Sequence, residues 1–170
     1  MANTYTLIAS QTLSGATASV TFSSIPATYT DLLLKFSIRS DATSGDSRIE
    51  FNGSGGTAYT GKILYADGST AASASHAGQA YLSWGGLVNR STTTSNTFAN
   101  NEFYIPNYAG SNYKSVSVDG VEENNATQSY SELSAGLWSN TAAITSIKLT
   151  PSSGNYVQYS TFYLYGIKNS

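Results

Sequence analysis

A two-residue alternation of apolar and polar side chains is the sequence feature that most restricts how this chain can fold. It is clearest between residues 31 and 39, where every second side chain is large and apolar. The alternating residues are Leu32, Leu34, Phe36 and Ile38. A helix repeats every 3.6 residues and would not place these side chains on one face, so the segment is predicted to be a β-strand.

The same alternation recurs along the chain and predicts about eleven short strands. The segments expected to be strands are 4–9, 20–22, 31–39, 48–51, 62–65, 81–84, 102–105, 113–118, 133–138, 147–149 and 156–167. A hairpin-type turn is expected at Asp119–Gly120. Segments 69–80 and 89–100 are rich in Ser, Thr, Ala and Asn, so we expect them to be loops, or arms that become ordered against a partner.

Strands of this number and spacing predict one domain, residues 1–170, with an all-β fold. We expect a jelly-roll β-sandwich of two antiparallel sheets, because this architecture leaves few exposed sheet edges. The core is expected to contain the apolar residues of the inner faces. These are Leu32, Leu34, Phe36, Ile38, Ile49, Phe51, Val116, Val118, Leu133, Leu137, Leu149, Phe162 and Leu164.

Charge and composition exclude several classes of function. The formal net charge is −2, only 11% of residues are charged, and the eight Lys and Arg residues are scattered, so nucleic acid is not expected as a partner. The first ten residues have no basic segment and no long apolar run, which argues against a signal peptide, and no stretch is long enough for a membrane span. We therefore expect synthesis in the cytoplasm and no membrane partner.

The sequence contains one histidine, His76, in a stretch typical of a surface loop. A Ser-His-Asp triad would need His76 beside a serine and an acid such as Asp67, but no G-x-S-x-G motif marks a nucleophile. We therefore expect a protein that is not an enzyme and has no catalytic residues. A hydrolase with His76 as its base stays an alternative.

Several carboxylates and glycines are further candidates for catalysis or ligand binding. A glycosidase needs two carboxylates across a cleft, but the adjacent Glu122 and Glu123 would point to opposite faces of a strand. We interpret them as part of a solvated Asn-rich loop with Asn124 and Asn125. Asp41 and Asp46 flank a turn but lack a calcium-loop motif, although calcium stays an alternative there. The glycines of 53–56 do not form a phosphate-binding loop. No cofactor and no metal site are expected.

Aromatic residues are the remaining candidates for binding. Exposed Trp and Tyr side chains stack on sugars or anchor protein interfaces. Ordinary core packing is the alternative for each of them, because strands are rich in aromatic residues. The candidate interface or ligand-contact residues are Tyr81, Trp84, Tyr104 and Trp138.

Three stretches resemble a loosely related group of small structural proteins from the virions of tailed phages. The first combines Thr6–Leu13 with Val20–Arg39, the second is Ile49–Gly53 followed by Tyr59, and the third is Phe162–Lys168. Residues 69 to 100 match this group least.

The resemblance implies a jelly-roll domain on the phage particle. It implies a capsid decoration (cement) protein that binds the major capsid protein, forms a homotrimer and stabilises the shell at the capsid surface. The group also includes modules of tail fibres, so a carbohydrate- or receptor-binding module of a fibre, with a glycan as ligand, is the alternative.

Overall fold

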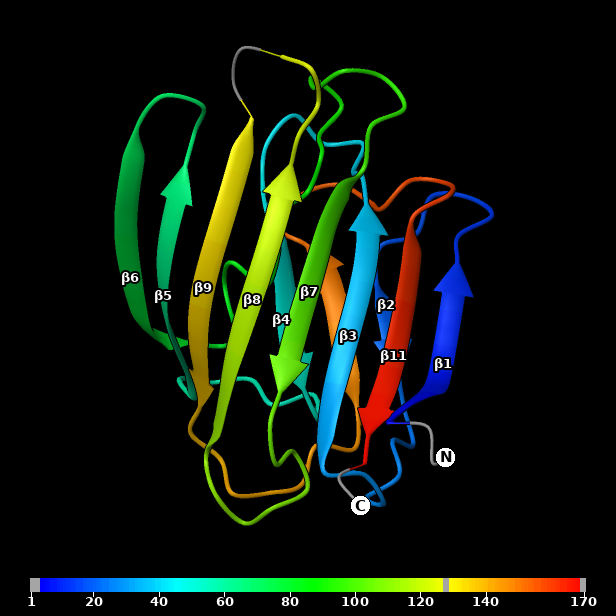
Figure 1. The fold of residues 1–170 in the computed structure, drawn as a ribbon, viewed down its shortest axis with the longest axis vertical. Helices are drawn as coiled ribbons and strands as arrows, with labels where there is room; N and C mark the ends of the chain where they lie inside the picture. The colour runs from blue at the N-terminus through cyan, green and yellow to red at the C-terminus, as the bar shows by residue number, and fades with distance from the viewer. Residues whose placement is uncertain (1–3, 127–128, 169–170) are drawn as a thin grey trace.

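The computed structural model describes residues 4–126 and 129–168, which fold into β-strands joined by loops (Figure 1). This part of the chain contains eleven strands. They are β1 (Tyr5–Thr12), β2 (Val20–Phe22), β3 (Asp31–Ile38), β4 (Ser47–Phe51), β5 (Tyr59–Ala66), β6 (Ala71–Gln79), β7 (Ala99–Ile105), β8 (Lys114–Glu122), β9 (Tyr130–Trp138), β10 (Ile147–Pro151) and β11 (Thr161–Ile167).

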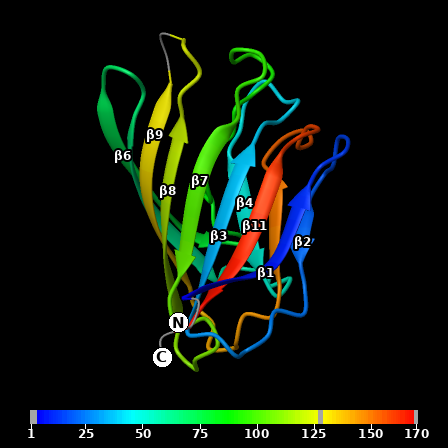
Figure 2. The ribbon, with the colours of Figure 1, turned by 45° about the vertical axis from the view of Figure 1, so that its right-hand side comes forward.

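The strands form two antiparallel sheets of unequal size. The large sheet has the order β1-β11-β3-β7-β8-β9-β5-β6, and the small sheet has the order β2-β10-β4. Strands near the two ends of the chain pair in both sheets, β1 with β11 and β2 with β10. This nested pairing is that of a jelly roll, so the predicted all-β sandwich of two antiparallel sheets is confirmed. The small sheet lies behind β3, β7 and β11, whereas β9, β5 and β6 extend beyond it (Figures 1 and 2).

The core lies between the sheets and follows the alternation of the sequence. The apolar residues predicted to face inward from β3, β4, β8, β10 and β11 are all buried. Aromatic rings connect the two layers, since the ring of Phe51 in β4 lies 5.5 Å from Trp138 and 6.3 Å from Phe103 in the large sheet. Burial of each large apolar side chain contributes roughly 1.5–3 kcal/mol, so this layer is the main source of stability.

The predicted phase of β9 is wrong. Leu133 is 58% exposed and Leu137 is only partly buried. The residues that face the core are Glu132, Ser134, Gly136 and Trp138. Trp138 explains the phase, because burying its large ring against Phe51 removes more apolar area from water than burying either leucine.

Segment 81–84 does not form the predicted regular strand. Leu82 exchanges two backbone hydrogen bonds with Ile49, and the Gly85 N–H donates to Ser47, so the segment follows the edge of β4. Trp84 has φ of +55°, in the left-handed region, and this conformation interrupts the pairing.

Most of the predicted loop at 69–80 is instead strand β6 (Ala71–Gln79), the edge of the large sheet. It pairs along its length with β5. The sequence of β6 shows no apolar alternation because most of its side chains are small Ala and Ser residues. An edge strand does not need this alternation, since backbone hydrogen bonds hold it to its neighbour. Residues 90–98 do form the predicted loop, and Arg39 donates to the carbonyl oxygens of Thr93 and Thr94 within it.

Two further boundaries differ from prediction. Asp119 and Gly120 lie within β8 and not in a turn, and Gly120 pairs with Asn101 on one side and Glu132 on the other. A Cβ at Gly120 would lie 2.7 Å from Asn101 Oδ1, so close packing and not a turn requires this glycine. The last strand begins at Thr161, while Tyr156 makes only isolated bridges.

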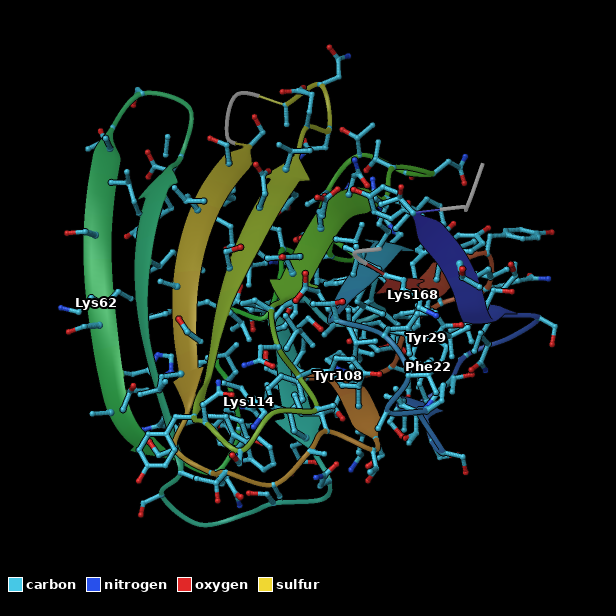
Figure 3. All side chains as sticks on the ribbon, turned by 60° about the horizontal axis from the view of Figure 1, so that its bottom comes forward. Phe22, Tyr29, Lys62, Tyr108, Lys114 and Lys168 are labelled. Atoms are coloured by element: carbon cyan, nitrogen blue, oxygen red, sulfur yellow. The ribbon has the colours of Figure 1, made fainter. Side chains whose placement is uncertain are left out.

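One end of the sandwich is closed by the loop between β7 and β8 (Figure 3). Tyr108 is fully buried there, and its hydroxyl donates to the Pro26 carbonyl oxygen. The Lys114 ammonium is also buried and donates to the carbonyl oxygens of Gly110 and Asn112, at 2.7 and 2.5 Å. Carbonyl oxygens therefore satisfy this buried cation, although desolvation lowers its pKa.

Candidate binding sites

The outer face of the large sheet carries apolar side chains that point into solvent. Leu64 of β5 and Leu133 of β9 lie directly opposite each other in the register, and Val121 is exposed at the end of β8. The exposed charged side chains on the strands of this face are Lys35, Lys62, Glu102 and Asp119. Low charge and exposed Leu, Val and Tyr side chains are the composition of a protein interface more than of an ordinary surface.

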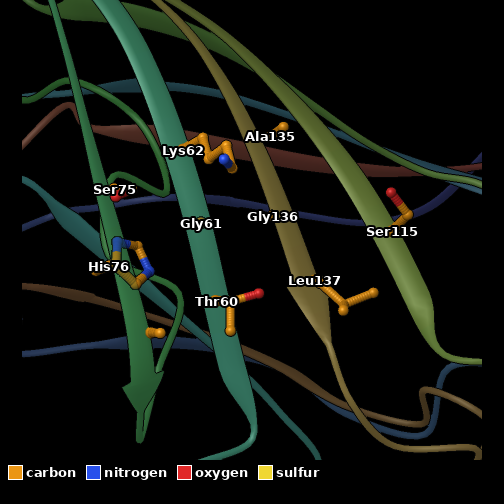
Figure 4. A pocket seen from close by; sticks show the side chains of 10 residues that line it. Thr60, Gly61, Lys62, Ser75, His76, Ser115, Ala135, Gly136 and Leu137 are labelled. Carbon is orange, nitrogen blue, oxygen red and sulfur yellow. The ribbon is translucent and has the colours of Figure 1, made fainter.

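Shallow depressions follow this face across β8, β9 and β5. The largest, of about 560 Å³, is shown in Figure 4 and is lined by Thr60 and Lys62 of β5, Leu137 of β9 and Ser115 of β8. Two more, of about 360 and 350 Å³, continue past Leu64 and Leu133. The face is therefore a broad, grooved surface and not a deep pocket.

A tyrosine-rich depression of about 420 Å³ lies at the other side of the same face. Tyr5, Leu33 and Tyr165 line it together with the ion pair between Lys35 Nζ and Glu102 Oε2, at 2.8 Å. The hydrogen bond to Glu102 raises the pKa of Lys35.

A second kind of site lies between β5 and β9 of the large sheet and the segment that follows β6. It is a cavity of about 310 Å³ that we call the acidic cleft. It is lined by Asp46, Ile63, Tyr65, Asp67, Ala74, Trp84, Leu87, Arg90, Tyr130 and Glu132. Alternation along β9 directs Glu132 toward this cavity, where it is only 6% exposed.

Glu132 is the most unusual group of the acidic cleft. Neither carboxylate oxygen has a hydrogen-bond partner among residues 4–126 and 129–168. Burial raises its pKa to about 8, and the charges of Asp46, Asp119 and Glu122 contribute to the rise. The Ser134 hydroxyl is close enough to lower this pKa, but it forms no hydrogen bond with Glu132 among the described residues. A buried carboxylate without a partner is costly to a fold and is concentrated at functional sites.

Arg90 lines the cleft with Glu132 and forms an ion pair with Glu122, which lies outside the lining. Arg90 Nη2 lies 3.5 Å from Glu122 Oε2, and its guanidinium carbon lies 5.3 Å from the centre of the Tyr130 ring. Glu122 is 1% exposed, and burial raises its pKa to about 7. The interpretation of Glu122 as part of a solvated loop is therefore wrong, because the alternation of β8 turns this residue inward, while Glu123 is exposed.

The four aromatic residues predicted as contacts lie in different environments. Trp84 lines the acidic cleft, and Tyr81 lies under the guanidinium of Arg48, 4.4 Å from its ring centre. The Tyr104 hydroxyl donates to Asp31 Oδ2 at 2.9 Å on the outer face. Trp138 is 1% exposed in the core, so it is not a surface contact, because its ring fills the space between the sheets.

His76 lies on strand β6 and not in a surface loop. Its ring covers Gly61 and lies 4.7 Å from the centre of Trp84, and burial lowers its pKa. Asp67 lies in the turn that joins β5 to β6, whereas His76 pairs with Gly61 toward the other end of the hairpin. The two residues are therefore not brought together.

The carboxylates considered for calcium are also separated. Asp41 is exposed and accepts hydrogen bonds from the backbone and side chain of Asn155, while Asp46 lines the acidic cleft. In the described part of the chain, no group of three or more His, Cys, Asp or Glu side chains is arranged to hold a metal ion. Within the same residues, no helix has the length and apolar character needed to cross a membrane.

Comparison with known proteins adds little to this geometry. No protein-family model and no curated protein sequence matches the chain. A crystal structure of a protein of unknown function from Shewanella oneidensis MR-1 has 10% sequence identity, and the alignment covers 100% of this chain and 82% of that chain. Its TM-score of 0.28 supports no statement about fold or function.

Sequence reasoning found Trp84 but missed Glu132 and Arg90. Glu132 could have been found from Trp138, since residues an even number apart on one strand share a face. The signal was hidden because Leu133 and Leu137 suggested the opposite phase. Arg90 had no periodic signal, because it lies in a loop.

Proposed function

We propose that this protein is a structural component of a phage virion, a capsid decoration protein that binds the major capsid protein through the outer face of its large sheet. The observation that carries the proposal is the broad, weakly charged face that exposes the opposed leucines Leu64 and Leu133. Such a face fits a large, flat partner better than it fits a small molecule. The three stretches that resemble virion structural proteins support the same partner.

A protein that binds only the assembled shell stabilises it by its binding free energy. Symmetric copies add avidity, which suits a face with many weak apolar contacts. Strand β6 supports self-association, because its nine residues carry no Asp, Glu, Lys or Arg and form an uncovered sheet edge in the described residues. Natural proteins usually protect such an edge with charge or proline.

A role without catalysis is part of this proposal. The candidate base His76 is packed between Gly61 and Trp84, away from Asp67. This environment favours a neutral structural imidazole over a triad member.

Counting copies in purified particles tests the proposal. Quantitative mass spectrometry should find hundreds of copies for each particle, in a fixed ratio to the major capsid protein. A handful of copies, or absence from the particle, would contradict a decoration role.

A glycan-binding module of a tail fibre is the second candidate, and one observation favours it. The depression with Tyr5 and Tyr165 combines aromatic rings with the polar pair Lys35 and Glu102, a combination that sugar sites use. A glycan array distinguishes the two functions. Specific binding that Tyr165→Ala removes would favour the fibre module, and no binding would favour the decoration protein.

A further inference from the structure

The acidic cleft contains a carboxylate that the fold itself does not satisfy. Glu132 is more than nine-tenths buried, lines the cavity, and has no hydrogen-bond partner for either oxygen among the residues described. Leaving a buried acceptor unpaired costs free energy, and the cost is larger if the acceptor is charged. A ligand that donates to both oxygens would recover this free energy.

The cation already present in the cleft does not reach Glu132. Arg90 is directed to Glu122, 3.5 Å away, to the carbonyl oxygen of Gly45 and to the ring of Tyr130. The charged groups that line the cleft with Glu132 are Asp46 before β4, Asp67 after β5 and Arg90 from the loop, together with the phenols Tyr65 and Tyr130. Outside the lining, the charges of Asp119 and Glu122 on β8 act on Glu132, and Arg48 of β4 acts on Asp46. Carboxylates outnumber guanidinium groups here, so the cleft favours a positive ligand.

The remaining walls suit a flat cation. The rings of Tyr65, Tyr130 and Trp84 line the cavity, and the centres of the two tyrosine rings lie 6.4 Å apart. Aromatic faces attract guanidinium groups, and two free oxygens on one carboxylate match the parallel N–H donors of a guanidinium. A cavity of about 310 Å³ accepts a single side-chain-sized group.

We propose that the acidic cleft binds a guanidinium group that donates two hydrogen bonds to Glu132. The group is either a free alkylguanidine or the arginine side chain of a partner protein. Because a guanidinium pairs with the ionised carboxylate, binding releases the proton that Glu132 holds in the empty protein.

Calorimetric titration of the full chain tests the proposal with butylguanidinium and with its neutral isostere butylurea. Butylguanidinium should bind about tenfold or more tightly at pH 8.5 than at pH 6, with release of a proton at neutral pH, because Glu132 must ionise. Butylurea and glucose should not bind. An acetylated Gly-Arg-Gly amide separates the two sources: tighter binding of the peptide indicates a partner arginine, and tighter binding of butylguanidinium indicates a free ligand.

Two variants give the matched control. Glu132→Gln keeps the shape of the side chain and should remove binding and proton release, whereas Glu123→Gln makes the same change at an exposed carboxylate that follows β8 and should leave both intact. Equal binding of butylurea, unchanged binding by Glu132→Gln, or no saturation by millimolar butylguanidinium at pH 8.5 would each overturn the proposal. None of these results depends on whether the protein binds a capsid.

Discussion

Gly120 of β8 and Glu132 of β9 are direct partners across the large sheet, and the space beside the glycine is occupied by its neighbours. A Cβ at position 120 would lie 3.2 Å from Glu132 Cγ and 2.7 Å from Asn101 Oδ1. Asn101 holds the loop of the acidic cleft, because its amide accepts from the Leu87 N–H and donates to the Leu87 carbonyl oxygen. The absence of a side chain at Gly120 therefore leaves room for Asn101, which connects the large sheet to the loop of the acidic cleft.

Gly120→Ala should destabilise the protein by about 1–3 kcal/mol, since the added methyl group forces the buried Asn101 to move and weakens its bonds to Leu87. Urea unfolding followed by tryptophan fluorescence measures the change. Gly55→Ala is the matched control, because a Cβ there meets nothing within 4 Å, and it should change the free energy of unfolding by less than about 0.5 kcal/mol. Equal effects of the two substitutions would contradict the packing role of Gly120.

Stability should fall as pH rises from about 5 to about 8.5. The folded state raises the pKa of Glu132 from its ordinary 4.5 to about 8, and that of Glu122 to about 7. Between these values the folded state binds more protons than the unfolded chain, so the stabilisation is complete below pH 4.5 and is lost as pH rises through the folded-state pKa values. Urea unfolding at a series of pH values measures the slope.

Glu132→Gln should reduce this slope and make the protein about 1–3 kcal/mol more stable at pH 8.5, because no charge is then buried. Glu123→Gln is the control: Glu123 is exposed, and hydrogen bonds from Asn125 and Ser129 lower its pKa. That control should leave the slope between pH 5 and 8.5 unchanged. A Glu132→Gln variant with the slope of the natural protein would show that Glu132 does not titrate in this range.

The double variant Leu64→Glu/Leu133→Lys should weaken binding to capsid shells at least tenfold, as replacing buried apolar contact residues of an interface does. The free energy of unfolding should stay within about 1 kcal/mol, because both side chains are more than half exposed and the new charges can pair across the strands. Co-sedimentation with purified shells measures the binding. Tyr159→Lys alters an exposed ring outside the sheet and should bind normally, and a double variant that also bound normally would exclude this face as the docking surface.

Lysines on the edge strand should prevent self-association. Ser75 and Ala77 are exposed on β6, and Ser75→Lys/Ala77→Lys places two positive charges where another copy would add a strand. Sedimentation equilibrium should give a trimer for the natural protein and a monomer for this variant. The same changes at Ser115 and Ser117 of the central strand β8 should leave the trimer intact, and a natural protein that is monomeric would contradict edge pairing.

Much of the fold follows from local sequence, and the acidic cleft does not. The alternation from Leu32 to Ile38 is enough to predict β3 and its buried face, because a strand gives no other way to bury four large apolar side chains together. The same argument fails at β9, where leucines alternate with Glu132 and Trp138. The local pattern does not show which face of β9 is buried, because that depends on the packing of Trp138 against Phe51 of the other sheet.

The sequence by itself determined a two-sheet β-sandwich, since period-two alternation allows each strand only two faces and the apolar one is buried. Only the tertiary structure decided that β6 is the edge strand of the large sheet. It also decided that one cavity is lined by Asp46, Arg90 and Glu132, which are far apart along the chain. The reason is that strand pairing over long sequence separations is set by the packing of the whole sandwich. No local sequence pattern determines that the Glu132 carboxylate is buried beside the cavity of the acidic cleft.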